Sequence, residues 1–287
     1  MKSLSEFMEA PVEEVRDVAP TTLILAAGGT RRSAALAGIA PESNEYARWS
    51  RERMMQCCQL LVDHGVQYIL TFAIVESQVA ERTAGYREKL VQWVDWGLAG
   101  PQALSDYQRL GWRVRLVGSR EFPALTDAAV RLEQATPGSG TPAIWWFVIR
   151  DLEAPWRWLI EAAQRSGASS REEVAAALYG EPIPPATMML SFGKPLVSPA
   201  LLPPLLYGKT HCYWSQRPSY ELDRRQLRAI LYDFAFLRRT WREDKLGRAE
   251  AALNQRSAWQ QGPTIGLGRR LGPFWYPVLD QLPGNEQ

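Results

Sequence analysis

The chain has 287 residues, of which 46% are hydrophobic and 22% charged, and its formal net charge is +2. These values describe a globular protein that can bury a full core, and the nearly balanced charge argues against a nucleic-acid-binding protein, which needs a basic face. Residues 1–20 lack the basic start and apolar centre of a secretory signal, and no apolar run reaches the ~18 residues that span a bilayer. We therefore expect a cytoplasmic protein with no transmembrane segment.

The cysteines and histidines give no framework for a disulfide-rich or zinc-binding protein. Cys57 and Cys58 are adjacent and Cys212 lies far from both, a spacing that matches neither a disulfide pattern nor a zinc motif. His64 and His211 are too few and too far apart to build a metal site alone. We expect reduced thiols, as in other cytosolic proteins.

Short apolar runs alternate with helical patterns along the chain. The runs typical of buried strands are residues 22–27, 66–75, 112–118, 143–149, 187–192 and 209–214. Apolar residues recur at helical spacing in residues 45–64, 83–98, 122–134, 156–164, 171–179 and 220–240. This alternation predicts an α/β fold with a mainly parallel central sheet of about six strands, flanked by helices.

No repeat or low-complexity stretch interrupts this order. We expect a single catalytic domain over residues 1–287. Within it, residues 1–20 form an N-terminal extension, and residues 241–287 form a tail that packs on the core or on a dimer partner.

Aromatic residues are abundant, with 12 Trp, 10 Tyr and 8 Phe, and several are adjacent, as in residues 145–147 and 274–276. Large aromatic side chains fill protein cores. They also line pockets for apolar substrates that become cationic, because the face of an aromatic ring attracts a cation. The count leaves both interpretations open.

A glycine-rich turn with two arginines follows the first predicted strand. In parallel sheets, ligands bind beyond the carboxyl ends of the strands, which places residues 28–32, residues 76–77 and Lys194 on one rim. Glycines let the backbone approach an anion, and Arg31 and Arg32 add donors that suit phosphate. The pattern is neither a Walker loop nor a dinucleotide fingerprint, and a plain turn with surface arginines also fits it.

Several stretches in order resemble one enzyme superfamily. They are GGTRRS (28–33), HG (64–65), LYGE (178–181), SFGK (191–194), GKTHCYWSQRPSYELDRRQLRAILYDFAFLRR (208–239) and LNQRSAWQQGPTIGLG with FWY (253–276). Together they resemble the cis-prenyltransferase (undecaprenyl diphosphate synthase) superfamily. The closer resemblance is to its tuberculosinol synthase and tuberculosinyl transferase branch, over nearly the whole chain.

The resemblance implies a diterpene synthase, a carbon–oxygen lyase or hydrolase. It would ionise a bicyclic, clerodane- or halimane-type diterpenyl diphosphate and release pyrophosphate. Water would then capture the allylic cation and give a tertiary diterpene alcohol such as kolavelool. Transfer to another nucleophile, such as a nucleoside nitrogen, stays open because one branch member is a transferase. The superfamily fold also implies a homodimer, and the family chemistry implies Mg²⁺.

The resemblance also implies residue roles. The residues expected to bind the diphosphate are Gly28, Gly29, Thr30, Arg31, Arg32 and Lys194. Tyr46 is expected to face the allylic cation or orient water, although it also fits an ordinary half-buried tyrosine of a helix. Glu76 is expected to bind Mg²⁺ or act as the general base, although it also fits a surface carboxylate at a strand end.

Two positions depart from the superfamily pattern. The first-strand motif begins with Asp, and that position is Gly28 here, so Glu76 is the substitute candidate for a Mg²⁺ ligand. Elongating enzymes hold a second diphosphate with an R-T-G-G-E run and an R-x-S run, whereas this chain reads SFGKPLVSPALLPP, with Lys194 as its one cation. This difference favours processing of a single diphosphate. A chain-elongating cis-prenyltransferase and a non-catalytic accessory subunit remain the alternatives.

Overall fold

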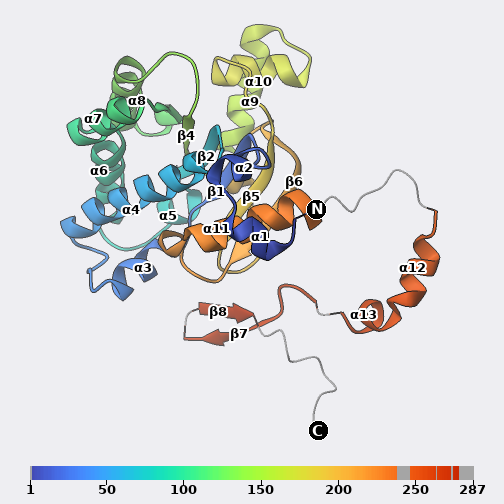
Figure 1. The fold of residues 1–287 in the computed structure, drawn as a ribbon. Helices are drawn as coiled ribbons and strands as arrows, with labels where there is room; N and C mark the ends of the chain where they lie inside the picture. The colour runs from blue at the N-terminus through green and yellow to red at the C-terminus, as the bar shows by residue number, and fades with distance from the viewer. Residues whose placement is uncertain (1, 238–245, 263, 273, 278–287) are drawn as a thin grey trace.

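The central feature is a six-stranded sheet with strand order β3-β4-β2-β1-β5-β6, in which every neighbouring pair is parallel (Figure 1). The computed structural model describes residues 2–237, 246–262, 264–272 and 274–277. The strands are β1 Thr22–Ala26, β2 Tyr68–Ile74, β3 Arg113–Val117, β4 Ala143–Val148, β5 Ala186–Phe192 and β6 Tyr207–Ser215. The predicted fold class and all six predicted strands are confirmed.

Helices cover both faces of the sheet, which is why the strands read as unbroken apolar runs: every residue of β1 and β4 is buried. One face packs against helices from both ends of the chain. They are α1 Leu4–Glu9, α2 Val12–Arg16, α4 Asn44–Asp63, α6 Tyr86–Ala99, α7 Pro101–Leu110, α8 Pro123–Ala135 and α11 Arg224–Tyr232. The other face packs against α9 Ala154–Ser166 and α10 Arg171–Tyr179. Two short helices, α3 Thr30–Leu36 and α5 Glu76–Val79, follow β1 and β2.

Helix α7 was not predicted, because residues 101–110 follow a Gly-Pro pair that usually marks a turn. In the structure Pro101 is the first residue of the helix, where its missing N–H costs nothing, and Gly111 ends it with φ of 66°. This asymmetry between proline at the start and glycine at the end is the signal that would have found α7.

The predicted helix over residues 220–240 begins later than expected. Asp223 caps α11 by accepting a hydrogen bond from the Gln226 backbone N–H at 2.7 Å. Residues 219–221 form a 3₁₀ turn instead, and a π turn over Asp233–Leu237 follows α11. Residues 238–240 lie outside the described residues. The late start matters for the site, because Tyr220 lies in the 3₁₀ turn before α11, where its side chain is buried.

The N-terminal segment is tied to α11 by a buried arginine. The Arg228 side chain donates hydrogen bonds to the backbone carbonyls of Phe7, Met8 and Ala10 at 3.3, 2.8 and 2.7 Å. Arg228 is 1% exposed, and its burial lowers the pKa of the guanidinium. The N-terminal segment and α11, which are more than 200 residues apart in sequence, therefore share one core.

The C-terminal tail contains α12 Arg248–Asn254, α13 Arg256–Gln261 and an antiparallel hairpin of β7 Gly268–Leu271 and β8 Phe274–Pro277. Figure 1 shows α12 and α13 standing apart from the sheet. None of the helices in the described part of the chain has the length and apolar character that a bilayer crossing requires.

Candidate active site

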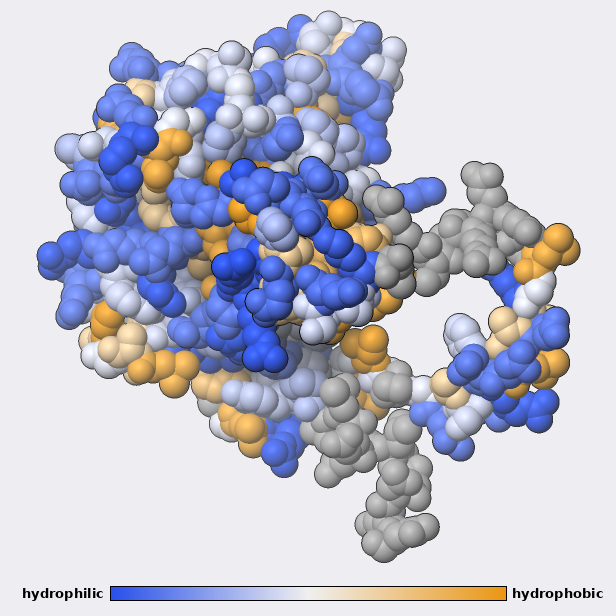
Figure 2. Space-filling model, in the orientation of Figure 1, coloured by the Kyte–Doolittle hydropathy of each residue, from blue (hydrophilic) through white to orange (hydrophobic). Residues whose placement is uncertain are grey.

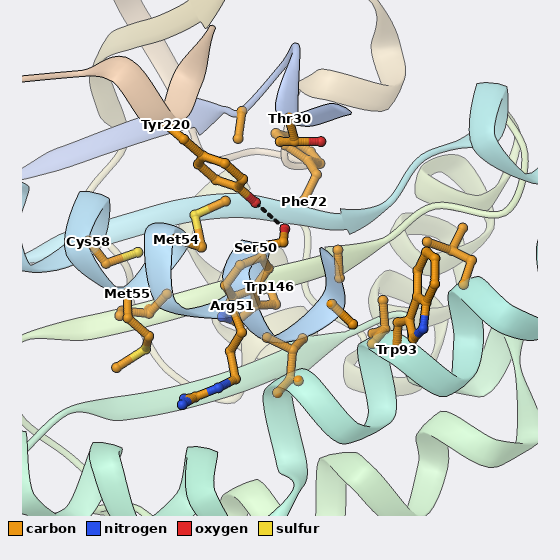
Figure 3. A pocket seen from close by; sticks show the side chains of 18 of the residues that line it. Thr30, Ser50, Arg51, Met54, Met55, Cys58, Phe72, Trp93, Trp146 and Tyr220 are labelled. Carbon is orange, nitrogen blue, oxygen red and sulfur yellow. Dashed lines mark hydrogen bonds between the residues drawn. The ribbon is translucent and has the colours of Figure 1, made fainter. Parts of the chain in front are cut away.

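An apolar cavity of about 230 Å³ lies between α4, α6 and the sheet (Figure 3). One face of α4 forms a wall of this cavity, because Tyr46, Ser50, Met54 and Cys58 line it at intervals of four residues. At 1.5 Å of rise per residue, this stripe extends for about 18 Å. The cavity is therefore an elongated apolar space of the kind that suits a hydrocarbon chain.

Aromatic side chains form much of the remaining wall. Phe72 of β2, Trp93 of α6 and Trp146 of β4 all line the cavity, whereas Trp112 is 1% exposed and fills the core. Some aromatic residues therefore line a pocket and others fill the core, so both interpretations of their abundance apply. The lining rings can stabilise a cation.

A bulge in β2 shapes the cavity wall. Phe72 pairs with Phe147 and Ile74 with Val148, so Ala73 is an extra residue between them. Bulges redirect side chains and are frequent beside active sites. Here Phe72 and Ala73, which are neighbours in sequence, both reach the cavity.

The glycines after β1 lie against neighbouring elements. A Cβ on Gly28 would stand 3.2 Å from the backbone oxygen of Phe192, at the end of β5. Gly29 has φ of 71°, and a Cβ there would stand 2.7 Å from Nη2 of Arg32. Glycine at position 29 lets the Arg32 guanidinium fold back onto the turn, and glycine at position 28 lets the turn approach β5. An aspartate at position 28 would need β5 to move by a few tenths of an ångström.

The two arginines differ in their partners. Arg31 donates to Glu81 at 2.9 Å and lies 4.6 Å from the centre of the Tyr86 ring. The hydrogen bond with Glu81 raises the pKa of Arg31 and lowers that of Glu81. Arg32 lies 4.9 Å from the ring centre of Phe274, on the tail hairpin. Sequence reasoning missed Glu81, which belongs to no motif, and gave Phe274 no role at the site although it noted the aromatic run 274–276.

Tyr46 joins the arginine turn to the cavity. Its hydroxyl forms a hydrogen bond of 2.9 Å with the Thr30 hydroxyl, and its ring meets Trp93 edge to face at 5.6 Å. The Ser43 side chain caps α4 by accepting from the Tyr46 N–H. Thr30 and Tyr46 both line the cavity, whereas Arg31 and Arg32, the next two residues of α3, do not. We call the end of the cavity beside Thr30 its mouth.

Glu76 and Lys194 lie at the same edge of the sheet but outside the cavity lining. Glu76 is half-buried at the start of α5, directly after β2, and Lys194 is exposed just after β5. Because β1 lies between β2 and β5, the predicted residues of all three strand ends share one rim. Within the described residues, no group of three His, Cys, Asp or Glu side chains is arranged to hold a metal ion.

Two further polar pairs, which were not predicted, involve residues that line the cavity: Ser50, Tyr220 and Arg51. The Ser50 and Tyr220 hydroxyls lie 2.6 Å apart, and Arg51 forms an ion pair with Asp106 at 2.8 Å. Ser50 and Tyr220 are 170 residues apart in sequence. No local pattern connects them, so only the folded chain reveals the pair.

Comparison with known proteins assigns the chain to a family. It is 48% identical over 275 residues to (+)-kolavelool synthase of Herpetosiphon aurantiacus, which covers 96% of this chain and 95% of that protein. This chain belongs to the kolavelool synthase family. The predicted resemblance to the tuberculosinol synthase branch agrees with a weaker match, 23% identity over 251 residues to tuberculosinyl adenosine transferase of Mycobacterium tuberculosis, covering 82% of this chain and 83% of that one.

This member of the kolavelool synthase family also resembles solved structures that have the cis-prenyltransferase fold. A probable undecaprenyl diphosphate synthase from Campylobacter jejuni matches with a TM-score of 0.54 and 18% identity, over 79% of this chain and 98% of that one. Lavandulyl diphosphate synthase from Lavandula x intermedia matches with a TM-score of 0.54 and 11% identity, over 77% and 97%. No protein-family model matches the chain. The cis-prenyltransferase-like fold that the resemblance implied is therefore confirmed.

Proposed function

We propose that this chain is a diterpene synthase that ionises a bicyclic diterpenyl diphosphate and captures the allylic cation with water, giving a tertiary alcohol such as kolavelool. The observation that carries the proposal is that a pair of arginines, suited to a diphosphate, lies next to an apolar cavity, suited to a hydrocarbon. The turn with Arg31 and Arg32 meets, at the Thr30–Tyr46 pair, an apolar cavity walled by aromatic rings. Membership of the kolavelool synthase family supports the same reaction.

In this proposal, Arg31 and Arg32 bind the diphosphate and stabilise the negative charge that develops as pyrophosphate departs. Glu81 holds Arg31 in place through their hydrogen bonds. The hydrocarbon lies along α4, where the rings of Trp93 and Trp146 shield the cation. The apolar walls exclude bulk water, so that a positioned water is the one that reacts.

The described segment that follows β5 offers little to hold a second diphosphate. Residues 191–204 carry Lys194 as their single cation, and its side chain is exposed. This supports ionisation of one substrate over condensation of two. Lys194 is proposed as an outer contact of the diphosphate, beyond the two arginines.

The residues present suit a magnesium ion that arrives with the substrate. Mg²⁺ is commonly held by one or two carboxylates together with substrate phosphates. Glu76 is half-buried at the rim and, within the described residues, forms no ion pair or side-chain hydrogen bond, so it can supply one oxygen ligand. When bound, the ion would neutralise charge on the departing diphosphate.

The Glu76→Gln variant is expected to need about three- to tenfold more Mg²⁺ for half-maximal activity, because one carboxylate ligand is replaced by a neutral amide. A titration of turnover against Mg²⁺ concentration measures this, with Glu88→Gln, on the exposed face of α6, as the matched control. An unchanged half-saturation would remove Glu76 from the metal site.

We also propose a homodimer in the cytoplasm. The tail supports the dimer, because several large apolar side chains on it are exposed (Figure 2), and such side chains are usually covered by a partner. They include Leu253, Trp259, Ile265, Leu267 and Leu271.

The proposed function is tested by a product assay. Purified protein with Mg²⁺ is given geranylgeranyl diphosphate or a bicyclic diterpenyl diphosphate, and extracts are analysed by gas chromatography–mass spectrometry. A diterpene alcohol from the bicyclic substrate is the expected result. Longer prenyl chains on addition of isopentenyl diphosphate would indicate an elongating enzyme instead, and no turnover of any diphosphate would indicate an accessory subunit.

A further inference from the structure

Two hydroxyl pairs line the cavity along α4, one helical turn apart. The first is Thr30–Tyr46 at the mouth, and the second is Ser50–Tyr220. Because Ser50 follows Tyr46 by four residues, it lies about 6 Å further along the helix axis. Figure 3 shows the Ser50 and Tyr220 hydroxyls directed at one another inside the pocket.

The Tyr220 side chain is held from several sides. It is 4% exposed, and its ring packs against Trp49 edge to face at 5.4 Å. Its backbone oxygen accepts a hydrogen bond from Arg53. The preceding residue, Ser219, donates its N–H to the Gly28 carbonyl at 2.9 Å. The turn that carries Tyr220 is thus fastened to the glycine turn of the predicted diphosphate site.

The second pair is placed where an attacking water is needed. In an allylic diphosphate, the tertiary carbon lies two carbons beyond the one that loses the diphosphate. A water that attacks the tertiary carbon must therefore sit deeper in the cavity than the departing oxygen. The Thr30–Tyr46 pair adjoins the diphosphate, and the Ser50–Tyr220 pair lies one turn deeper.

The chemistry of the pair suits a bound water. Each hydroxyl has one O–H donor and two acceptor lone pairs. Their mutual hydrogen bond uses one donor, which leaves one O–H and several lone pairs for a water molecule. Burial raises the pKa of Tyr220, so the phenol stays neutral and does not itself trap the cation as a phenolate.

We propose that the Ser50–Tyr220 hydroxyl pair positions the water that captures the cation at its tertiary carbon, an inference that rests on the proposed diterpene synthase function. The bond between carbon and the diphosphate oxygen breaks with both electrons leaving on pyrophosphate. A lone pair of the water forms the new carbon–oxygen bond. The surplus proton goes to the released pyrophosphate, and both hydroxyls end in the state in which they began.

The test measures, in Tyr220→Phe and Ser50→Ala, whether the cation is captured by water to give an alcohol or loses a proton to give an olefin. Pyrophosphate release is expected to stay within about threefold of the unmodified protein, because the arginine turn is intact. The ratio of alcohol to olefin is expected to fall about tenfold, the effect of losing one positioning hydrogen bond, since a cation without a positioned water loses a proton instead. Ser50→Thr, which keeps a hydroxyl, should restore the ratio.

Tyr179→Phe is the matched control, because the Tyr179 phenol is also buried and donates to the Pro204 carbonyl at 2.7 Å on the other face of the sheet. It should leave the product ratio unchanged. Unaltered ratios in both pocket variants, or equal losses of pyrophosphate release and alcohol in folded Ser50→Ala protein, would overturn the inference. Absence of pyrophosphate release by the unmodified protein would instead overturn the proposed function on which it rests.

Discussion

The Arg32→Ala variant is expected to lose about 10²- to 10³-fold in kcat for a diterpenyl diphosphate, the effect of removing one donor to a developing anion. Arg32 lies against the Gly28–Gly29 turn, and its Nη2 is 3.9 Å from where a Cβ on Gly193 would stand. It therefore lies between the ends of β1 and β5, where the leaving group would be held. Steady-state release of pyrophosphate measures the loss.

Two variants make the Arg32 result specific. Arg32→Lys keeps the charge but loses the planar, bidentate group that suits phosphate, so its activity should be intermediate. Arg48→Ala removes an exposed arginine from α4 and should change turnover by less than about twofold. Retention of most activity by Arg32→Ala would mean that the diphosphate is bound elsewhere.

Two substitutions at Gly97 are expected to have different effects: a small side chain should stabilise the fold, and a large one should reduce activity. Gly97 lies in α6, is buried and lines the cavity, and a Cβ built on it meets no atom within 4 Å. Gly97→Ala should raise the free energy of unfolding by about 0.5–1 kcal/mol, because alanine favours a helix and the space is open. Urea unfolding of this variant measures the gain.

A larger side chain at the same position should exclude the substrate. Gly97→Phe occupies space that the bicyclic skeleton needs, and overpacking of about 1–3 kcal/mol corresponds to a fall in kcat/KM of about 10- to 100-fold. Gln92→Phe, on the exposed side of α6, is the control and should keep its activity. A Gly97→Phe enzyme with unchanged kcat/KM would show that the substrate does not occupy this cavity.

The sequence predicts the sheet well because helices cover both of its faces and bury its central strands. Strands such as β4, all of whose residues are buried, are visible as continuous apolar runs. Helix boundaries depend on single capping residues, and the Asp223 cap explains why α11 begins after Tyr220. Helix α7 was not predicted because its first residue belongs to a Gly-Pro pair that usually marks a turn.

Apart from Tyr46, which the family resemblance supplied, the residues of the candidate site that could be predicted all follow strand ends. The glycine turn, Glu76 and Lys194 come directly after β1, β2 and β5, and parallel strands bring such positions to one rim. The contact of Thr30 with Tyr46 links two predicted residues. In contrast, the Ser50–Tyr220 pair and the Arg32–Phe274 contact join segments far apart in sequence, which only tertiary structure brings together.

The origin of the oxygen in the product tests the central claim most directly. The protein is incubated with a bicyclic diterpenyl diphosphate in ¹⁸O-labelled water, and the alcohol and the released phosphates are analysed by mass spectrometry. Ionisation followed by capture predicts one ¹⁸O atom in the tertiary alcohol and none in the pyrophosphate. Unlabelled alcohol together with labelled phosphate would mean that a phosphorus–oxygen bond is cleaved, and would contradict the account.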